Sequence, residues 1–254
     1  MSTLKAFHKD PRTVAREIPG VFDAIFPQLS PSVVAYFNAT RINPEMCDPI
    51  DEEVIESSSL AKAMLFELAI ARAELLMEEH EPNDVWTDCL NTALLRQRVY
   101  FDAQLPDYLE EDDKIVAEQI AQNLVDILRD LERARKSTTV VQSPKIPGFQ
   151  WIATGNGDFS LGATIIEVKC GRRNFSAADY RQVLIYWLLS YLSSLEADTV
   201  EYTEIILINP RRNQVVALTI EEMLRLVASG RSKIEIAQMF SSLVSEHVMR
   251  LANE

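Results

Sequence analysis

Residues 155–169 read GNGDFSLGATIIEVK, and this stretch predicts two short strands joined by a tight turn. Gly162 followed by Ala163 suits a two-residue hairpin turn with glycine in the first position. Pairing the strands about this turn places Asp158 opposite Glu167. A bulge at the preceding glycines would shift this register by one residue.

Two charged residues follow each other at strand spacing near the end of the second strand. Glu167 and Lys169 are two residues apart, so they point to the same side of a strand. The neighbouring residues are largely apolar, and a charged pair facing inward from such a segment is costly unless it has a use. Two carboxylates beside one lysine can hold a divalent metal and prepare a water for attack on a phosphodiester. Asp158, Glu167 and Lys169 are therefore candidate catalytic residues.

The same residues also have ordinary structural explanations. Asp158 beside Gly157 is a typical turn former. Glu167 and Lys169 could lie on a solvated strand face with cross-strand partners.

The composition describes a globular chain of 254 residues, with 47% hydrophobic and 25% charged residues. No apolar run approaches the roughly 18 residues that cross a bilayer, so we expect no membrane association. Three cysteines far apart in the chain indicate a reducing compartment and a cytoplasmic location. With only three histidines as well, zinc and iron–sulfur sites are not expected.

The net charge of -13 is unevenly distributed along the chain. Residues 137–234, which contain the candidate site, hold ten Lys and Arg against nine Asp and Glu. An acidic protein is poorly suited to hold nucleic acid by charge alone, because phosphate binding rests on Lys and Arg. The near-neutral site region favours a polyanionic substrate there, with a protein partner or a homo-oligomer supplying further affinity.

Apolar periodicity and capping residues predict an α/β protein. We expect an all-helical N-terminal region over residues 1–113 and a core over residues 114–254. The acidic faces of the N-terminal region are solvated or bind a partner protein. The predicted helices are 57–80 with a serine cluster as its cap, 84–101, 114–136, 176–195, 220–228 and 233–251. The predicted strands include 149–154, 204–208 and 215–218.

Gln182 and Tyr186 lie four residues apart on the predicted helix 176–195, so they share one of its faces. Taken alone they could be ordinary helix residues. In chain order, however, they follow a G-x-x-D segment at 155–158 and an E-x-K segment at 167–169.

These three segments together resemble the PD-(D/E)xK nuclease superfamily, and most closely its RecB-like branch, which includes lambda-exonuclease-like enzymes. The resemblance covers roughly residues 116–220. It implies a restriction-endonuclease-like core, which is a small mixed sheet flanked by helices.

The resemblance also implies roles for individual residues. Asp158, Glu167 and the backbone carbonyl of Val168 would ligate Mg²⁺ or Mn²⁺. Lys169 would orient or deprotonate the attacking water. Gln182 would support the metal–water shell or contact the substrate, with Tyr186 behind it.

Further positions are more open. An acidic residue on the helix before the core often completes such sites; Glu118 is the first candidate, ahead of Glu67 and Glu74. Arg172 and Arg173, just past the lysine, would grip phosphates or simply cover a surface.

The sequence therefore predicts a metal-dependent nuclease that hydrolyses DNA, with RNA as a possible substrate. We expect it to be a subunit of a bacterial or phage defence, restriction or repair system. The alternative is a catalytically silent nuclease-fold subunit that acts as a structural or regulatory protein-binding partner.

Overall fold

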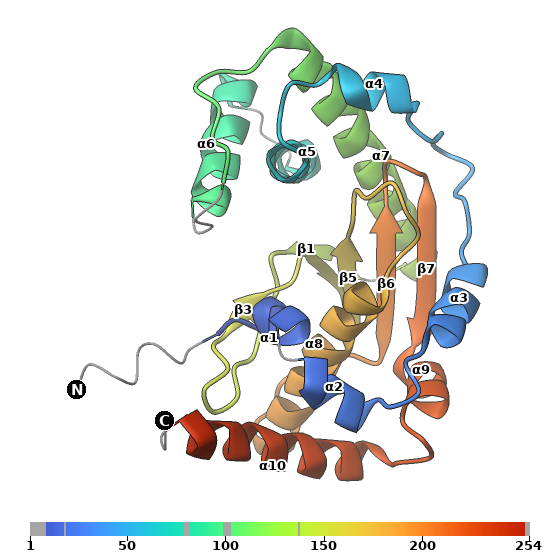
Figure 1. Ribbon diagram of the computed structural model, residues 1–254. Coiled ribbons are helices and arrows are strands. Elements are labelled where there is room, and N and C mark those ends of the chain that lie inside the picture. The colour runs from blue at the N-terminus through green and yellow to red at the C-terminus, as the bar shows by residue number, and fades with distance from the viewer. Residues whose placement is uncertain (1–8, 18, 79–81, 99–102, 137, 252–254) are drawn as a thin grey trace.

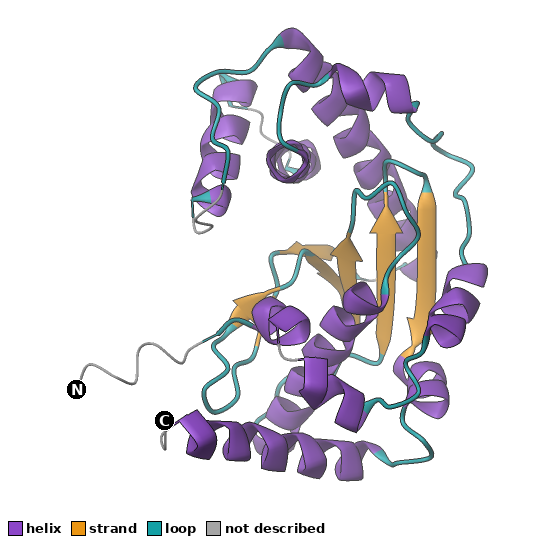
Figure 2. Ribbon diagram, in the orientation of Figure 1, coloured by secondary structure: helices purple, strands orange, loops and turns teal. Residues whose placement is uncertain are grey.

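The computed structural model describes residues 9–17, 19–78, 82–98, 103–136 and 138–251, and they form a mixed α/β fold (Figures 1 and 2). The helices are α1 (Pro11–Glu17), α2 (Pro19–Ile25), α3 (Pro31–Ala39), α4 (Glu52–Ser57), α5 (Lys62–Met77), α6 (Val85–Gln97), α7 (Glu111–Arg135), α8 (Ala177–Glu196), α9 (Ile220–Val227) and α10 (Lys233–Leu251). The strands are β1 (Val140–Gln142), β2 (Lys145–Ile146), β3 (Gly155–Asn156), β4 (Phe159–Leu161), β5 (Thr164–Val168), β6 (Glu204–Asn209) and β7 (Gln214–Thr219).

Five strands form the main sheet in the order β1-β4-β5-β6-β7, and β2 pairs with β3 separately. Within the main sheet, β5 and β6 run parallel, while the other neighbouring strands are antiparallel. Helix α8 makes the crossover that a parallel pair requires. The predicted strands 204–208 and 215–218 are confirmed as the antiparallel pair β6 and β7.

The predicted hairpin around Gly162 is also confirmed. Leu161 pairs with Thr164 and Phe159 pairs with Ile166 across β4 and β5. Gly162 has φ of +59°, a conformation that residues with a Cβ rarely adopt. Continuing this register by one residue brings Asp158 opposite Glu167.

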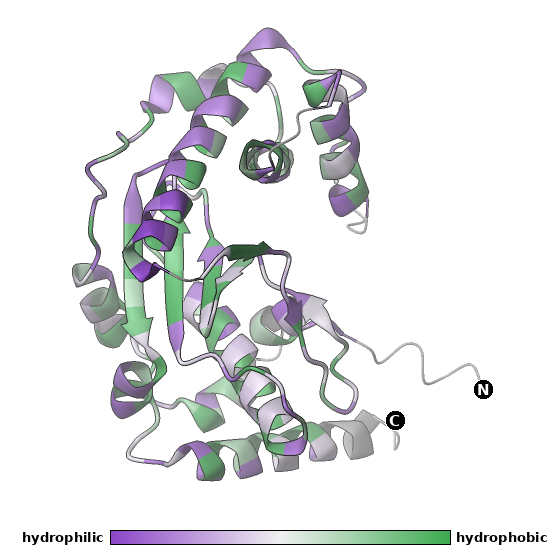
Figure 3. Ribbon diagram, turned by 180° about the vertical axis from the view of Figure 1, so that it is seen from behind, coloured by the Kyte–Doolittle hydropathy of each residue, from purple (hydrophilic) through white to green (hydrophobic). Residues whose placement is uncertain are grey.

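The two faces of the main sheet are covered by different helices (Figure 1). Alternate side chains of β5 divide between them: Ile165 packs in the hydrophobic cluster with α8, whereas Ile166 and Val168 pack with α7. Seen from behind, the central strands are largely hydrophobic, whereas α7 carries many hydrophilic residues (Figure 3). Glu167 is on the same side of β5 as Ile165, so it projects toward α8.

The start of α8 follows directly from its sequence. The Ser176 side chain accepts a hydrogen bond from the backbone N–H of Asp179, and the Asp179 carboxylate accepts from the backbone N–H of Ser176. This is the predicted capping box. Most of the following two turns are buried, which fixes the rotation of α8 and hence the direction of Gln182 and Tyr186.

Residues 149–154 do not form the predicted strand. Phe149 and Ile152 exchange backbone hydrogen bonds across a tight turn in which Gln150 has φ of +53°. The Trp151 indole donates to the carbonyl of Val244 on α10. The apolar residues that suggested a strand instead anchor a turn, because their partners lie outside the sheet.

The serine cluster does not cap α5 either. That helix begins after Ala61, which makes no side-chain capping bond. Ser58 Oγ donates instead to Asp113 Oδ1 at 2.7 Å, and the backbone N–H of Ser59 donates to the same oxygen at 2.9 Å. Asp113 is fully buried, so these bonds attach the loop before α5 to the start of α7.

Packing crosses the boundary expected at residue 113. Val14, Phe22 and Phe37, from α1, α2 and α3, belong to the same hydrophobic cluster as α8. Helices α4, α5 and α6 pack with the first half of α7 in another cluster. None of the helices within the described residues has the length and apolar character of a membrane span.

Candidate active site

Five residues predicted from sequence lie together where β5 meets α8. Gln182 Nε2 donates to Glu167 Oε1 at 2.6 Å and to the Tyr186 hydroxyl at 2.8 Å. Lys169 Nζ donates to the same Glu167 oxygen at 2.7 Å and to Gln182 Oε1 at 3.1 Å. The lysine and the glutamine therefore converge on one carboxylate oxygen.

Asp158 is held by two donors. Its Oδ2 accepts from the backbone N–H of Val168 at 2.8 Å, and its Oδ1 accepts from Arg12 Nη2 at 2.7 Å. Arg12 also donates through Nε to the Tyr186 hydroxyl at 2.9 Å. Arg12 thus joins the carboxylate of the hairpin to the tyrosine of α8.

Sequence reasoning did not identify Arg12. It lies 146 residues before Asp158, in a short helix that carries no motif. The packing of α1 against α8 is what brings it to the site. No local spacing signals such a contact.

Glu167 has an unusual environment for a carboxylate. It is 1% exposed, and its Oε2 atom has no hydrogen-bond partner among the residues that the structure describes. Burial and the nearby Asp158 raise the pKa of Glu167, although Lys169 and Arg12 oppose this change. Burial lowers the pKa of Arg12, but the charges of Asp158 and Glu167 raise it by more. The net effect is a raised pKa, so the guanidinium stays charged.

The donor set suits a hard divalent cation. Carboxylate and carbonyl oxygens are the preferred ligands of Mg²⁺ and Mn²⁺, and Oε2 of Glu167 is a buried acceptor to which none of the described residues donates. In the described part of the chain, no group of three or more His, Cys, Asp or Glu side chains is placed to hold a metal. Such an ion would rely on a backbone carbonyl and waters beside two carboxylates, as Mg²⁺ sites commonly do.

The structure places the three acidic candidates on the preceding helices differently. Glu118 on α7 is ion-paired with Arg72 Nε at 2.6 Å and does not line the pocket that contains Asp158. Glu67 and Glu74 on α5 do line that pocket. The pKa of both α5 residues is raised, mainly by burial and further by Asp158. Arg96 lowers these pKa values, but by less than burial raises them. The side chain of Glu118 points to the helices rather than to the sheet, which spacing along α7 did not reveal.

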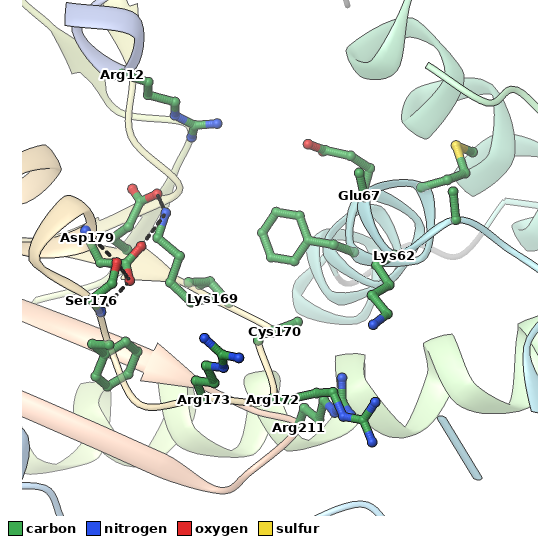
Figure 4. A pocket seen from close by; sticks show the side chains of 18 of the residues that line it. Arg12, Lys62, Glu67, Lys169, Cys170, Arg172, Arg173, Ser176, Asp179 and Arg211 are labelled. Atoms are coloured by element: carbon green, nitrogen blue, oxygen red, sulfur yellow. Dashed lines mark hydrogen bonds and ion pairs between the residues drawn. The ribbon is translucent and has the colours of Figure 1, made fainter. Parts of the chain in front are cut away.

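A cleft of about 1000 Å³ opens beside Lys169, between α5 and the loop that follows β5 (Figure 4). Its basic lining residues outnumber its acidic ones. The basic residues are Arg12, Lys62, Lys169, Arg172, Arg173 and Arg211, and the acidic ones are Glu67, Glu167 and Asp179. The cleft is therefore a basic region in a chain of net charge -13.

Arg172 and Arg173, for which the sequence left phosphate binding and a surface role open, both line this cleft but differ in their pairing. Arg172 is ion-paired with Glu52 at 2.8 Å and with Glu56 at 3.4 Å. Arg173 is exposed and, among the described residues, forms no ion pair. Buried Arg211 also pairs with Glu52. Of these three arginines, Arg173 is consequently the one most available to an anionic ligand.

Comparison of the chain with protein-family models, with curated proteins and with solved structures gives no match.

Proposed function

We propose that the protein is a metal-dependent nuclease of the PD-(D/E)xK type that hydrolyses DNA phosphodiester bonds. The observation that carries this proposal is the convergence of Lys169 and Gln182 on Glu167, with Asp158 fixed across the hairpin. The group lies beside a cleft lined mainly by basic residues. Buried charges with this geometry are costly for stability alone, which favours a chemical role.

Asp158, Glu167 and the Val168 carbonyl would hold the Mg²⁺ or Mn²⁺ ion. When bound, such an ion polarises the phosphoryl oxygen and lowers the pKa of a coordinated water. Lys169 would orient the attacking water and stabilise negative charge that develops on the phosphate. Its side chain lines the cleft and is 20% exposed, and its Nζ is held by Glu167, so its position is largely set before substrate arrives.

Gln182 and Tyr186 would act as positioning residues. Gln182 uses its amide nitrogen on Glu167 and its amide oxygen on Lys169, so it sets the distance between acid and lysine. Tyr186 accepts hydrogen bonds from Gln182 and Arg12, and it connects the two halves of the network.

The order of elements around the site supports the same class. A long helix, an antiparallel set of β1, β4 and β5, the crossover helix α8 and the parallel strand β6 follow one another. This is the arrangement expected of a restriction-endonuclease-like core. The acidic pair and lysine lie on the central hairpin, and the glutamine and tyrosine on the crossover helix.

The basic cleft favours a polyanion, with DNA as the proposed substrate and RNA as a possible one. Because the chain as a whole is acidic, a protein partner or a homo-oligomer would add affinity. A role as a subunit of a bacterial or phage defence, restriction or repair system agrees with this requirement for a partner that adds affinity for nucleic acid.

One observation favours the second candidate, a silent nuclease-fold subunit with a structural or regulatory role. The Arg12 guanidinium is ion-paired with Asp158, so it takes the place that a metal ion would have on this carboxylate in an active enzyme.

A cleavage assay separates the two candidates. Purified protein is incubated with single- and double-stranded DNA and with RNA, in Mg²⁺, Mn²⁺ or chelator, beside Lys169→Ala. The matched control is Lys145→Ala, which removes an exposed lysine of β2. We expect metal-dependent cleavage that falls about 100-fold or more in Lys169→Ala and is unchanged in the control. Cleavage that Lys169→Ala retains in full would refute the proposed site.

A further inference from the structure

We infer that the Arg12 guanidinium competes with the divalent cation for Asp158, so that this arginine restrains metal binding. This inference rests on the proposed metal site. It assigns Arg12 the role of an internal cation that holds the carboxylate in the metal-free protein.

The hydrogen bonds around the two carboxylates identify the oxygens open to a metal. Glu167 Oε1 accepts from Lys169 and Gln182, whereas Glu167 Oε2 has no partner within the described part of the chain. Asp158 Oδ2 is bonded to the backbone N–H of Val168, which belongs to β5 and cannot move away without opening the sheet. Oδ1 is instead held at 2.7 Å by the side chain of Arg12, which can move, so Oδ1 is the oxygen that a metal can take over from a competing cation.

Electrostatic repulsion makes joint occupation of that oxygen unfavourable. A guanidinium and a divalent ion on one carboxylate oxygen would be only a few ångströms apart. The Asp158 side chain is 9% exposed, so little water screens the two charges from each other. A metal would therefore bind more weakly with Arg12 in place than without it.

Arg12 has room to leave the carboxylate without unfolding α1. Its side chain is 30% exposed and lines both the main cleft and the smaller pocket beside Asp158. Helix α1 itself is attached by buried Val14 and Ala15 and by the backbone bond from Ala153 N–H to Lys9. The guanidinium can turn toward the cleft while these contacts persist.

A support role for Arg12 predicts the opposite effect. If its bonds to Asp158 and Tyr186 served to preorganise the site for metal, their removal would weaken metal binding. The sign of the change in Mn²⁺ affinity therefore decides between competition and support.

The test is isothermal titration of Mn²⁺ into wild type and Arg12→Ala at equal ionic strength. We expect Arg12→Ala to bind Mn²⁺ about tenfold more tightly, as loss of one partly buried charge repulsion implies. Arg12→Lys retains a charge and should stay near wild type. The matched control is Arg181→Ala, which removes an α8 arginine paired with Asp23 at 3.5 Å. Circular dichroism checks that each variant is folded.

A second measurement does not depend on titration. Mn²⁺ should raise the unfolding midpoint of Arg12→Ala more than that of wild type, because tighter binding stabilises the folded state more. Asp158→Asn should abolish this difference.

The outcomes distinguish this inference from the proposed function. If wild type binds Mn²⁺ and Arg12→Ala binds it equally or more weakly, competition is refuted and the metal site stands. If neither wild type nor Arg12→Ala binds Mn²⁺, both the metal site and the inference are refuted.

Discussion

The backbone N–H of Val168 donates to Asp158 Oδ2 at 2.8 Å, so the first carboxylate is attached to the strand that carries the second. This bond crosses the hairpin of β4 and β5 beyond the last pair of that ladder, one residue past Phe159 on the first side and two residues past Ile166 on the second. Sheet geometry, rather than a free side-chain rotamer, therefore sets the position of Asp158 relative to Glu167.

Asp158→Ala should destabilise the protein by about 2–3 kcal/mol, because it leaves the Val168 N–H without its acceptor and the Arg12 guanidinium without its carboxylate. Asp158→Asn can keep an acceptor toward Val168 and should cost less. Urea unfolding of both variants measures the difference. Equal stability of Asp158→Ala and wild type would show that these bonds contribute nothing net.

Gly162→Ala should cost about 1 kcal/mol of stability, because a residue with a Cβ is strained at φ of +59°. The added Cβ would also lie 3.1 Å from Thr138 Cγ2. Gly20→Ala is the matched control, since its Cβ would meet nothing within 4 Å in helix α2. Thermal unfolding should show a lower midpoint for Gly162→Ala only; the same loss in both would contradict the turn explanation.

Glu67→Gln should change how stability depends on pH. Burial raises the pKa of Glu67 above its ordinary value of 4.5, Asp158 raises it further, and Arg96 opposes them. A raised pKa means that the folded protein holds this proton more tightly, so its stability contribution is present at low pH and is lost as pH rises. Glu67→Gln should therefore gain stability relative to wild type between about pH 4 and pH 7. Urea unfolding at several pH values tests this, and a difference that shrinks as pH rises would contradict it.

Arg173→Ala should weaken binding of an oligonucleotide and reduce the salt dependence of its affinity by about one unit of slope. The reason is that Arg173 lines the cleft and has no competing ion pair among the described residues. Arg225→Ala on α9, exposed and away from the cleft lining, is the matched control. Fluorescence anisotropy at several salt concentrations measures both. Equal slopes for wild type and Arg173→Ala would place the nucleic acid elsewhere.

Local chemistry accounts for what could be predicted from the sequence. The turn at Gly162 and the alternation of β5 together predicted the pairing that brings Asp158 and Glu167 to one place. The capping box at Ser176 set the phase of α8, and with it the common direction of Gln182 and Tyr186. The family resemblance and the nuclease activity remain predictions.

The structure of segments whose side chains bond to residues far away in the chain was predicted less well. The strand expected at 149–154 is a turn because Trp151 is anchored on α10, and the serines before α5 bond to Asp113 of α7. Spacing along the chain contains no information about such partners.

By itself, the sequence determined the hairpin, the helix that follows it and the shared face of Gln182 and Tyr186, because each depends on interactions within a few residues or on strand and helix periodicity. That these two residues join Asp158, Glu167 and Lys169 was implied by the family resemblance. Only the tertiary structure decided that Arg12 is ion-paired with Asp158 and that Glu67 rather than Glu118 lines the pocket beside Asp158. It also decided that basic residues line one cleft. Those relationships depend on how α1 and α5 pack against the sheet and α8, through contacts between segments far apart in the chain.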